Sequence, residues 1–140
     1  MILSLDTNVM VDILNDRTDR VRDRYRAAQA AGDKLVTCAV AAYELIYGAA
    51  ISPRPQVHLP NAEELLDALE IEPWTLEDGY AASRLRFSLR KAGRMNGSAD
   101  ILIAGQALNR HWTVVSSNLR EFERVEGLQV VDWREPPQDA

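Results

Sequence analysis

Three carboxylates stand out because apolar residues surround them in the sequence. Asp6 directly follows the apolar run Met1–Leu5. Glu44 lies in an otherwise apolar stretch that begins at Cys38, and Asp100 lies near the start of another apolar run. Charged side chains are rarely buried unless they are paired or bind a metal. If the three carboxylates converge, their mutual repulsion requires a counter-charge, which a hard divalent cation such as Mg²⁺ or Mn²⁺ would supply.

Each of these acids also has a purely structural interpretation. Asp6 could form an Asx turn or cap a helix that starts near Asn8. Glu44 could pair with a buried arginine. Asp100, in the first turn of a predicted helix, could simply complement the helix dipole. The convergence hypothesis is favoured because all three follow or lie near predicted strand ends.

The cysteine and histidine content argues against a zinc site or a disulfide framework. Cys38 is the single cysteine, and His58 and His111 are expected to be surface or capping residues. A cation held by carboxylates beside a basic stretch is suited to phosphodiester hydrolysis, because the cation can activate water while Arg and Lys hold the nucleic-acid backbone.

Charge is distributed unevenly along the chain. The 16 basic and 21 acidic residues leave a net charge of −5, which argues against a protein that coats nucleic acid through its overall charge. Residues 83–110, however, contain Asp100 as their single acid among several basic residues. The candidates for RNA binding in this basic stretch are Arg84, Arg86, Arg90 and Arg94. A solvated helix face and a dock for an acidic peptide are the alternatives.

Apolar spacing and turn residues predict alternating strands and helices. Strands are predicted at residues 1–5, 34–38, 71–74, 112–116 and 129–132. Helices are predicted at residues 9–14, 18–31, 40–50, 61–69, 77–92 and 98–109. Residues 53–60 are predicted to be a proline-rich loop and residues 93–97 a turn. The helix at 77–92 is expected to bury Tyr80, Leu85 and Leu89.

The alternation indicates an α/β fold, with a mostly parallel sheet covered by helices on both faces. In such sheets the functional site lies at the carboxyl ends of the strands, where this sequence places Asp6-Thr7-Asn8 and Ser116-Ser117-Asn118. The 140 residues predict a single domain spanning 1–140. No apolar run is long enough to span a membrane and Met1–Asp6 is not typical of a secretory signal, so a cytoplasmic location is expected.

Several ordered motifs resemble the PIN-domain ribonucleases of the VapC type, the toxins of bacterial toxin–antitoxin pairs. The similarity runs from Ile2 to Trp133. It rests on Leu5-Asp6-Thr7-Asn8, Glu44-Leu45-Ile46-Tyr47-Gly48, Asp100-Ile101-Leu102-Ile103-Ala104 and Ser116-Ser117-Asn118-Leu119-Arg120-Glu121-Phe122. Each motif alone is weak, whereas their order and spacing are specific.

The resemblance implies a PIN-like α/β/α sandwich and a Mg²⁺- or Mn²⁺-dependent endoribonuclease. It places Asp6, Glu44 and Asp100 on the family's acidic triad. Asp6 and Asp100 are the implied metal ligands, with Glu44 as a further candidate ligand. Asn118 occupies the usual place of a fourth acid, and Glu121 is a candidate for that catalytic role. Thr7, Asn8, Ser116 and Asn118 are expected to support the site, with Thr7 and Asn8 orienting Asp6.

The resemblance also implies partners. These are a VapB-type antitoxin, a second copy of the chain in a homodimer, and an RNA substrate. The closing segment, from Phe122 to Trp133, is most similar to members that cut the anticodon stem-loop of initiator tRNA. No membrane partner is expected.

Two other functions remain open on the sequence. A phosphoryl-accepting receiver or phosphatase also uses a strand-end Asp, but it needs a lysine late in the site, and the two lysines here are Lys34 and Lys91. A catalytically silent PIN-like module would bind RNA or a partner without cutting. The three acids argue against this module.

Overall fold

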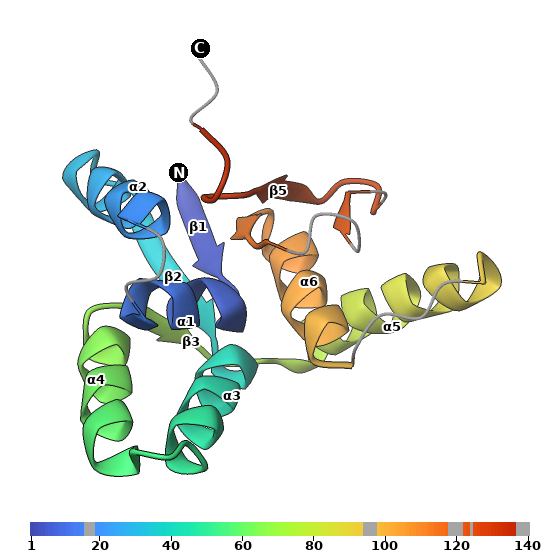
Figure 1. Cartoon of the computed structure of the whole chain (residues 1–140). Coiled ribbons are helices and arrows are strands. Elements are labelled where there is room, and N and C mark those ends of the chain that lie inside the picture. Colours follow the sequence, from blue (N-terminus) through green and yellow to red (C-terminus); the bar gives the residue numbers. More distant parts are fainter. Residues whose placement is uncertain (16–18, 94–97, 118–121, 124, 137–140) are drawn as a thin grey trace.

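The computed structural model describes residues 1–15, 19–93, 98–117, 122–123 and 125–136 (Figure 1). The strands are β1 (Ile2–Leu5), β2 (Lys34–Cys38), β3 (Glu70–Glu72), β4 (Thr113–Val115) and β5 (Gln129–Val131). The helices are α1 (Thr7–Asn15), α2 (Asp19–Ala30), α3 (Ala39–Ala50), α4 (Pro55–Asp67), α5 (Leu76–Lys91) and α6 (Ser98–Arg110). In the described parts of the chain, no helix is long and apolar enough to cross a membrane.

The five strands form one sheet in the order β3-β2-β1-β4-β5, and every pairing is parallel. The first strand of the chain, β1, lies at the centre. Its Leu3 pairs with Leu35 of β2 on one side and with Thr113 of β4 on the other. The predicted α/β class with a mostly parallel sheet is confirmed. Because all strands run the same way, the ends of β1 and β4 meet at one edge.

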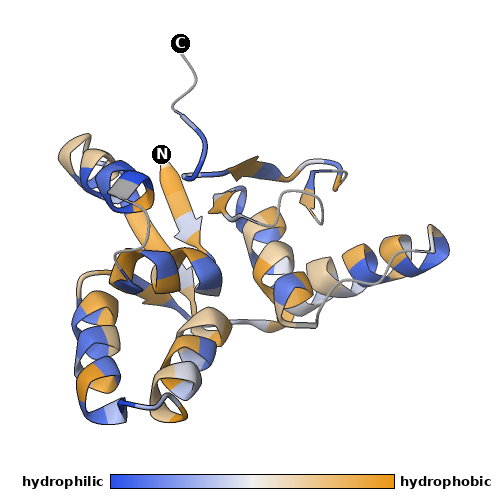
Figure 2. Cartoon of the chain, viewed as in Figure 1, coloured by the Kyte–Doolittle hydropathy of each residue, from blue (hydrophilic) through white to orange (hydrophobic). Residues whose placement is uncertain are grey.

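Helices cover both faces of the sheet because its strands are apolar on both sides (Figure 2). Leu3, Leu5 and Leu35 pack in a cluster with buried residues of α1, α2, α3 and α4. Val36 and Val114 point to the other cluster, which includes Ala107 of α6. The alternation of these side chains between the two faces produces a three-layer arrangement.

On the second face, α5 packs closely along α6. Gly105 is the point of closest approach, since a Cβ added there would lie 2.6 Å from the Cβ of Ala82. Leu85 and Leu89 of α5 are buried with Ile101 and other residues of α6, as predicted.

Two local predictions are wrong. The predicted loop at 53–60 is largely helical, because Pro55 is the first residue of α4, where a missing N–H removes no intrahelical bond. Pro60 lies inside this helix, which is held by the buried Ala62 and Leu65. Tyr80 was expected to be buried but is 61% exposed. The close approach of α5 to α6 leaves room for small alanines rather than for a tyrosine.

Candidate active site

Asp6 links the central strand to the first helix and is almost completely buried, with 2% of its surface exposed. Its Oδ1 accepts a hydrogen bond from the backbone N–H of Val9 at 2.9 Å. This bond makes Asp6 the N-cap of α1, the structural role considered from the sequence. The backbone N–H of Asp6 donates to the carbonyl oxygen of Val115 at 3.1 Å. Asp6 is therefore fixed at the edge where β1 and β4 end.

Burial raises the pKa of Asp6 to about 6. Hydrogen bonds from the Ser116 hydroxyl and the Val9 amide lower this pKa, whereas the charges of Asp100 and Asp12 raise it further. At neutral pH, Asp6 is thus a buried carboxylate that is repelled by the negative charges of Asp100 and Asp12. A cation would relieve this repulsion.

Ser116 immediately follows β4 and is completely buried. Its backbone N–H donates to the carbonyl of Val131 at 3.0 Å, which fixes the residue beside Asp6. Its hydroxyl bonds to the Asp6 side chain. The structure thus places Ser116 against Asp6, as expected for a supporting residue.

Thr7 contacts Glu44 rather than Asp6. Its Oγ1 donates a hydrogen bond to Oε1 of Glu44 at 2.7 Å, across the contact between α1 and α3. The expectation that Thr7 orients the Asp6 side chain is therefore wrong, because the carboxylate of the cap bonds to the amide of Val9 instead. Asn8 is exposed on the first turn of α1.

Asp100 lies in the first turn of α6 and is half-buried. Its charge acts on Asp6, so these two acids lie within electrostatic reach of each other. Glu44 is bonded to Thr7, the neighbour of Asp6 in the chain. Within the described residues, no group of three or more Asp, Glu, His or Cys side chains is arranged to hold a metal ion.

The donor chemistry still fits a hard cation. Mg²⁺ commonly binds proteins through one or two carboxylates and keeps several water ligands. Asp6 and Asp100 supply two such carboxylates, and the pKa of Asp6 is raised mainly by burial and further by the charge of Asp100. Asn118 and Glu121, the candidates for the fourth position, lie outside the described residues, as does the predicted turn beyond Gly93.

The structure adds one acid that sequence reasoning missed. Asp12 of α1 accepts hydrogen bonds from the Nε and Nη2 atoms of Arg134 at 3.1 and 2.8 Å. Its charge also raises the pKa of Asp6. The helical position of Asp12 could be read from the sequence, but no local pattern indicates its pairing with a residue so distant in the chain.

A second buried acid, Asp78, belongs to a structural network. It caps α5 with Thr75, and Arg110 donates to its Oδ2 at 3.0 Å while Asn109 donates to its Oδ1 at 2.9 Å. Burial alone raises the pKa of Asp78, but the bonds from Arg110, Thr75 and Asn109 outweigh it, and the net pKa is lowered. This acid stabilises the packing of α5 on α6.

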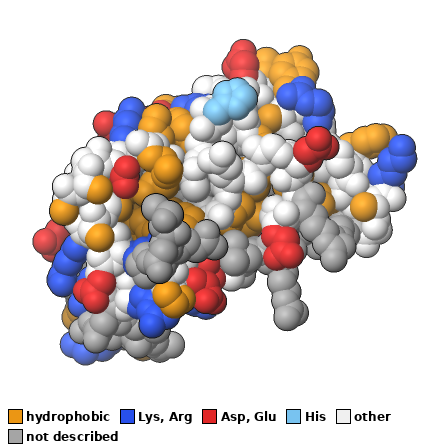
Figure 3. All heavy atoms as spheres, turned by 90° about the horizontal axis from the view of Figure 1, so that it is seen from above, with side chains coloured by type: hydrophobic (Ala, Val, Ile, Leu, Met, Phe, Trp, Pro, Cys, Tyr) orange, Lys and Arg blue, Asp and Glu red, His pale blue; other side chains and the backbone are white. Residues whose placement is uncertain are grey.

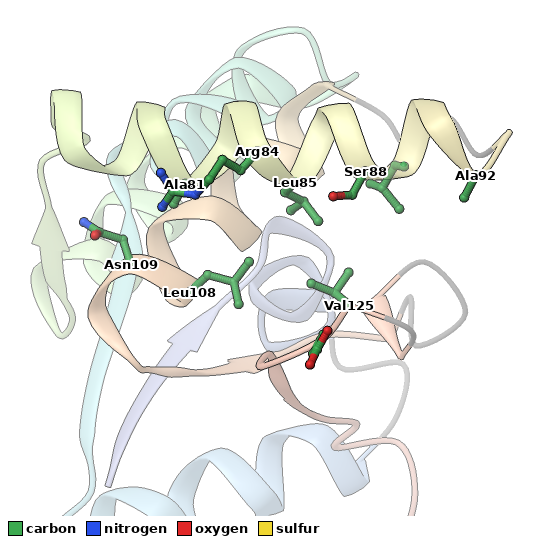
Figure 4. Close-up of a pocket in the computed structure, with 10 residues that line it drawn as sticks. Ala81, Arg84, Leu85, Ser88, Ala92, Leu108, Asn109 and Val125 are labelled. Atoms are coloured by element: carbon green, nitrogen blue, oxygen red, sulfur yellow. The ribbon is translucent and has the colours of Figure 1, made fainter.

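The predicted basic residues lie exposed along α5. Arg86 and Arg90 flank a shallow hollow together with Phe87. Arg84 instead lines a larger cavity of about 660 Å³ between α5, the end of α6 and Val125 (Figure 4). Arg94 lies outside the described residues. On the face seen in Figure 3, acidic and basic side chains are interspersed rather than gathered into one patch.

Comparison with known proteins places this geometry in a family. The PIN domain family matches residues 3–128. The tRNA(fMet)-specific endonuclease VapC of Shigella flexneri is 33% identical over 129 residues, covering 92% of this chain and 96% of that protein. Ribonuclease VapC2 of Haemophilus influenzae is also 33% identical over 129 residues, with the same coverage.

Solved structures agree with the sequence matches. VapBC2 from Rickettsia felis, bound to a DNA fragment from its promoter, superposes with a TM-score of 0.88 at 27% identity and covers 95% of this chain and 99% of the matched chain. DNA-bound VapBC from Salmonella typhimurium gives a TM-score of 0.86 at 30% identity, covering 95% of this chain and 98% of that one. The chain therefore belongs to the PIN domain family, as a VapC-type ribonuclease toxin of the VapBC toxin–antitoxin systems.

Proposed function

We propose that this chain is a Mg²⁺- or Mn²⁺-dependent endoribonuclease whose catalytic residues are Asp6, Glu44 and Asp100, acting in one domain over residues 1–140. The observation that carries the proposal is the buried Asp6 carboxylate, which is fixed at the ends of β1 and β4 and feels the charge of Asp100. Burying the charged Asp6 carboxylate is unfavourable, and a bound cation would offset this cost.

The residues of the site have distinct roles in this proposal. Asp6 and Asp100 hold the cation, and Glu44 either adds a ligand or accepts a proton from the attacking water. When bound, the cation supplies an activated water and neutralises charge on the phosphodiester. Ser116 and the Val9 amide hold the Asp6 carboxylate, while Thr7 fixes Glu44. Glu121 remains a candidate for a further catalytic acid.

We propose initiator tRNA, cut at its anticodon stem-loop, as the substrate. Support comes from two relatives named as tRNA(fMet)-specific endonucleases, from Shigella flexneri at 33% identity and from Salmonella typhimurium at 31%. Arg84, Arg86, Arg90 and Arg94 would contact the RNA backbone as sequence-independent phosphate ligands.

We propose two protein partners as well. A VapB-type antitoxin is supported by structural neighbours that are VapBC complexes. A homodimer is the expected oligomer, and the exposed Tyr43 and Tyr47 of α3 are candidates for its contacts. Their rings stack with centroids 6.4 Å apart.

The test is cleavage of purified initiator tRNA by antitoxin-free protein with Mg²⁺, Mn²⁺ or EDTA, beside Asp6→Asn. We expect one pair of fragments that requires both the metal and Asp6. Asn retains the helix cap, so loss of cleavage in a folded variant reports on the carboxylate charge. Intact tRNA with a retarded gel band would favour the alternative, a PIN-like module that binds RNA without cutting.

A further inference from the structure

A cavity of about 300 Å³ is lined by Glu44 and by other residues of three helices. The faces of α1, α3 and α4 that meet here lie together in Figure 1. Residues spaced three or four apart line it from each helix, as expected for a single helical face. The lining includes Val11 and Leu14 from α1, Glu44 and Gly48 from α3, and His58 and Asn61 from α4.

One of the proposed catalytic acids, Glu44, lines the cavity. Glu44, which forms one of its walls, bonds to Thr7, and Thr7 follows Asp6 directly. Val11 lies one helical turn beyond Thr7 on α1. A ligand whose reacting group lies at the acids can therefore extend a neighbouring group into the cavity.

The chemistry of the lining selects the kind of group. Leucine, valine and alanine form apolar walls, while His58 and Asn61 provide an aromatic ring and an amide. Glu44 is the single formally charged lining residue among those described, so the cavity offers no cation to a phosphate. A neutral, planar group with hydrogen-bonding edges fits this combination. Unstacked nucleobases are read by stacking on aromatic rings and by amide contacts to their edges.

We propose that this cavity is a nucleobase subsite, which holds the unstacked base next to the phosphate that is cut. The proposal rests on the proposed ribonuclease function and extends it to base recognition. His58 supplies a stacking surface, and the Asn61 amide reads the base edge. Both residues come from α4, so this helix contributes to the choice of cleavage position.

Gly48 allows a direct test, because a Cβ at this position meets no atom within 4 Å. Gly48→Leu places a side chain in the cavity without disturbing the helix, since leucine is a better helix former than glycine. Gly48→Ala is the matched control, with the same gain in helix propensity but little added volume. Asn61→Ala is a second variant at an exposed position, where folding is safe.

The measurement is kcat/KM on an RNA hairpin with a mapped cut, and on versions with an abasic nucleotide at each position flanking the cut. Gly48→Leu should lower kcat/KM roughly tenfold or more, a loss on the scale of one stacked base, while Gly48→Ala stays near wild type. One abasic substitution should produce a similar loss in wild type and no further loss in Gly48→Leu. Asn61→Ala should change the relative rates among the four bases at that nucleotide.

Wild-type kcat/KM in Gly48→Leu, or an abasic loss that persists in full in that variant, would overturn the subsite. The same holds if Gly48→Leu cuts RNA normally but escapes inhibition by the purified antitoxin, because the cavity would then hold a peptide. If wild type cuts no RNA, the proposed function fails separately. The fluorescence of 2-aminopurine riboside 5′-monophosphate, measured without metal, then tests the subsite. We expect wild type to quench this fluorescence and Gly48→Leu not to quench it. If wild type does not quench it, the subsite is overturned.

Discussion

Thr7 and Glu44 are joined by a 2.7 Å hydrogen bond between two helices that are otherwise separated by a strand and a helix in the sequence. This bond restrains the Glu44 carboxylate through Thr7, the residue that follows the buried Asp6. An acid that is held in this way needs no reorganisation before it reacts.

Replacing Thr7 by Val should therefore lower kcat for RNA cleavage by about 10- to 100-fold while leaving the fold intact, because Val preserves shape but removes the donor. Thr7→Ser retains the hydroxyl and should remain within a few-fold of wild type. Single-turnover cleavage rates would measure both. Equal rates for Thr7→Val and Thr7→Ser would mean that Glu44 does not depend on this bond.

Asp6 makes the metal-free protein less stable as the pH rises. Its pKa is about 6 in the folded state against an ordinary value of 3.8, so the folded state binds more protons between these values. The free energy of unfolding should fall through this window by about 2–3 kcal/mol because of this one group. Urea unfolding of wild type and Asp6→Asn from pH 4 to 8 would test it. The variant should become the more stable protein at pH 8, and parallel curves would contradict the assignment.

Mg²⁺ should reverse that instability. Binding to the folded state alone stabilises it by about 2.7 kcal/mol at a concentration one hundred times Kd. We expect Mg²⁺ to raise the Tm of wild type at pH 8 and to leave the Tm of Asp6→Asn unchanged, with EDTA restoring the starting value. An equal shift in both proteins would place the cation elsewhere.

Neutralising Arg86 and Arg90 together should weaken RNA binding and reduce its dependence on salt. Each lost phosphate contact lowers the slope of log K against log salt by about 0.7 for single-stranded RNA. The charge-matched control replaces two other exposed arginines, Arg26 of α2 and Arg54, the residue before α4. If log K depends on log salt with the same slope in both double variants, the α5 arginines do not contact RNA and simply form a solvated helix face.

Asp78→Asn should destabilise the protein by about 2 kcal/mol without a direct effect on catalysis, because the variant leaves Arg110 without its buried partner. The pKa of Asp78 is lowered in the folded state, so its contribution exists above the ordinary pKa and is lost as the pH falls. Thermal unfolding beside the exposed Glu77→Gln would measure the effect. If Asp78→Asn cleaves RNA with the wild-type rate constant at temperatures below its own Tm, the role of Asp78 is structural.

The architecture and the position of the site were predictable because both follow from short-range patterns. Lys34–Cys38 was predicted with the bounds of β2, and the polar residues after β1 and β4 marked the edge where Asp6 and Ser116 meet. The start of α4 was missed because Pro55 looks like a helix breaker locally but is favourable at the first helical position.

The long-range pairs could not be predicted. Arg134 and Asp12 lie in segments with no shared pattern, and their contact depends on how the chain after β5 is held against α2. The role of Thr7 was mistaken for the same reason, since its partner Glu44 approaches from another helix. Local sequence specifies which residues end a strand, whereas packing decides which side chains those residues touch.

The central position of β1 also determines when the site can exist during synthesis. Asp6 leaves the ribosome well before its partners Val115 and Ser116, which are made only after β2, β3 and the helices α1 to α6. The nascent chain therefore lacks the residues that fix Asp6 at the sheet edge until β4 has emerged. A site centred on β1 can therefore be completed only late in the translation of the chain.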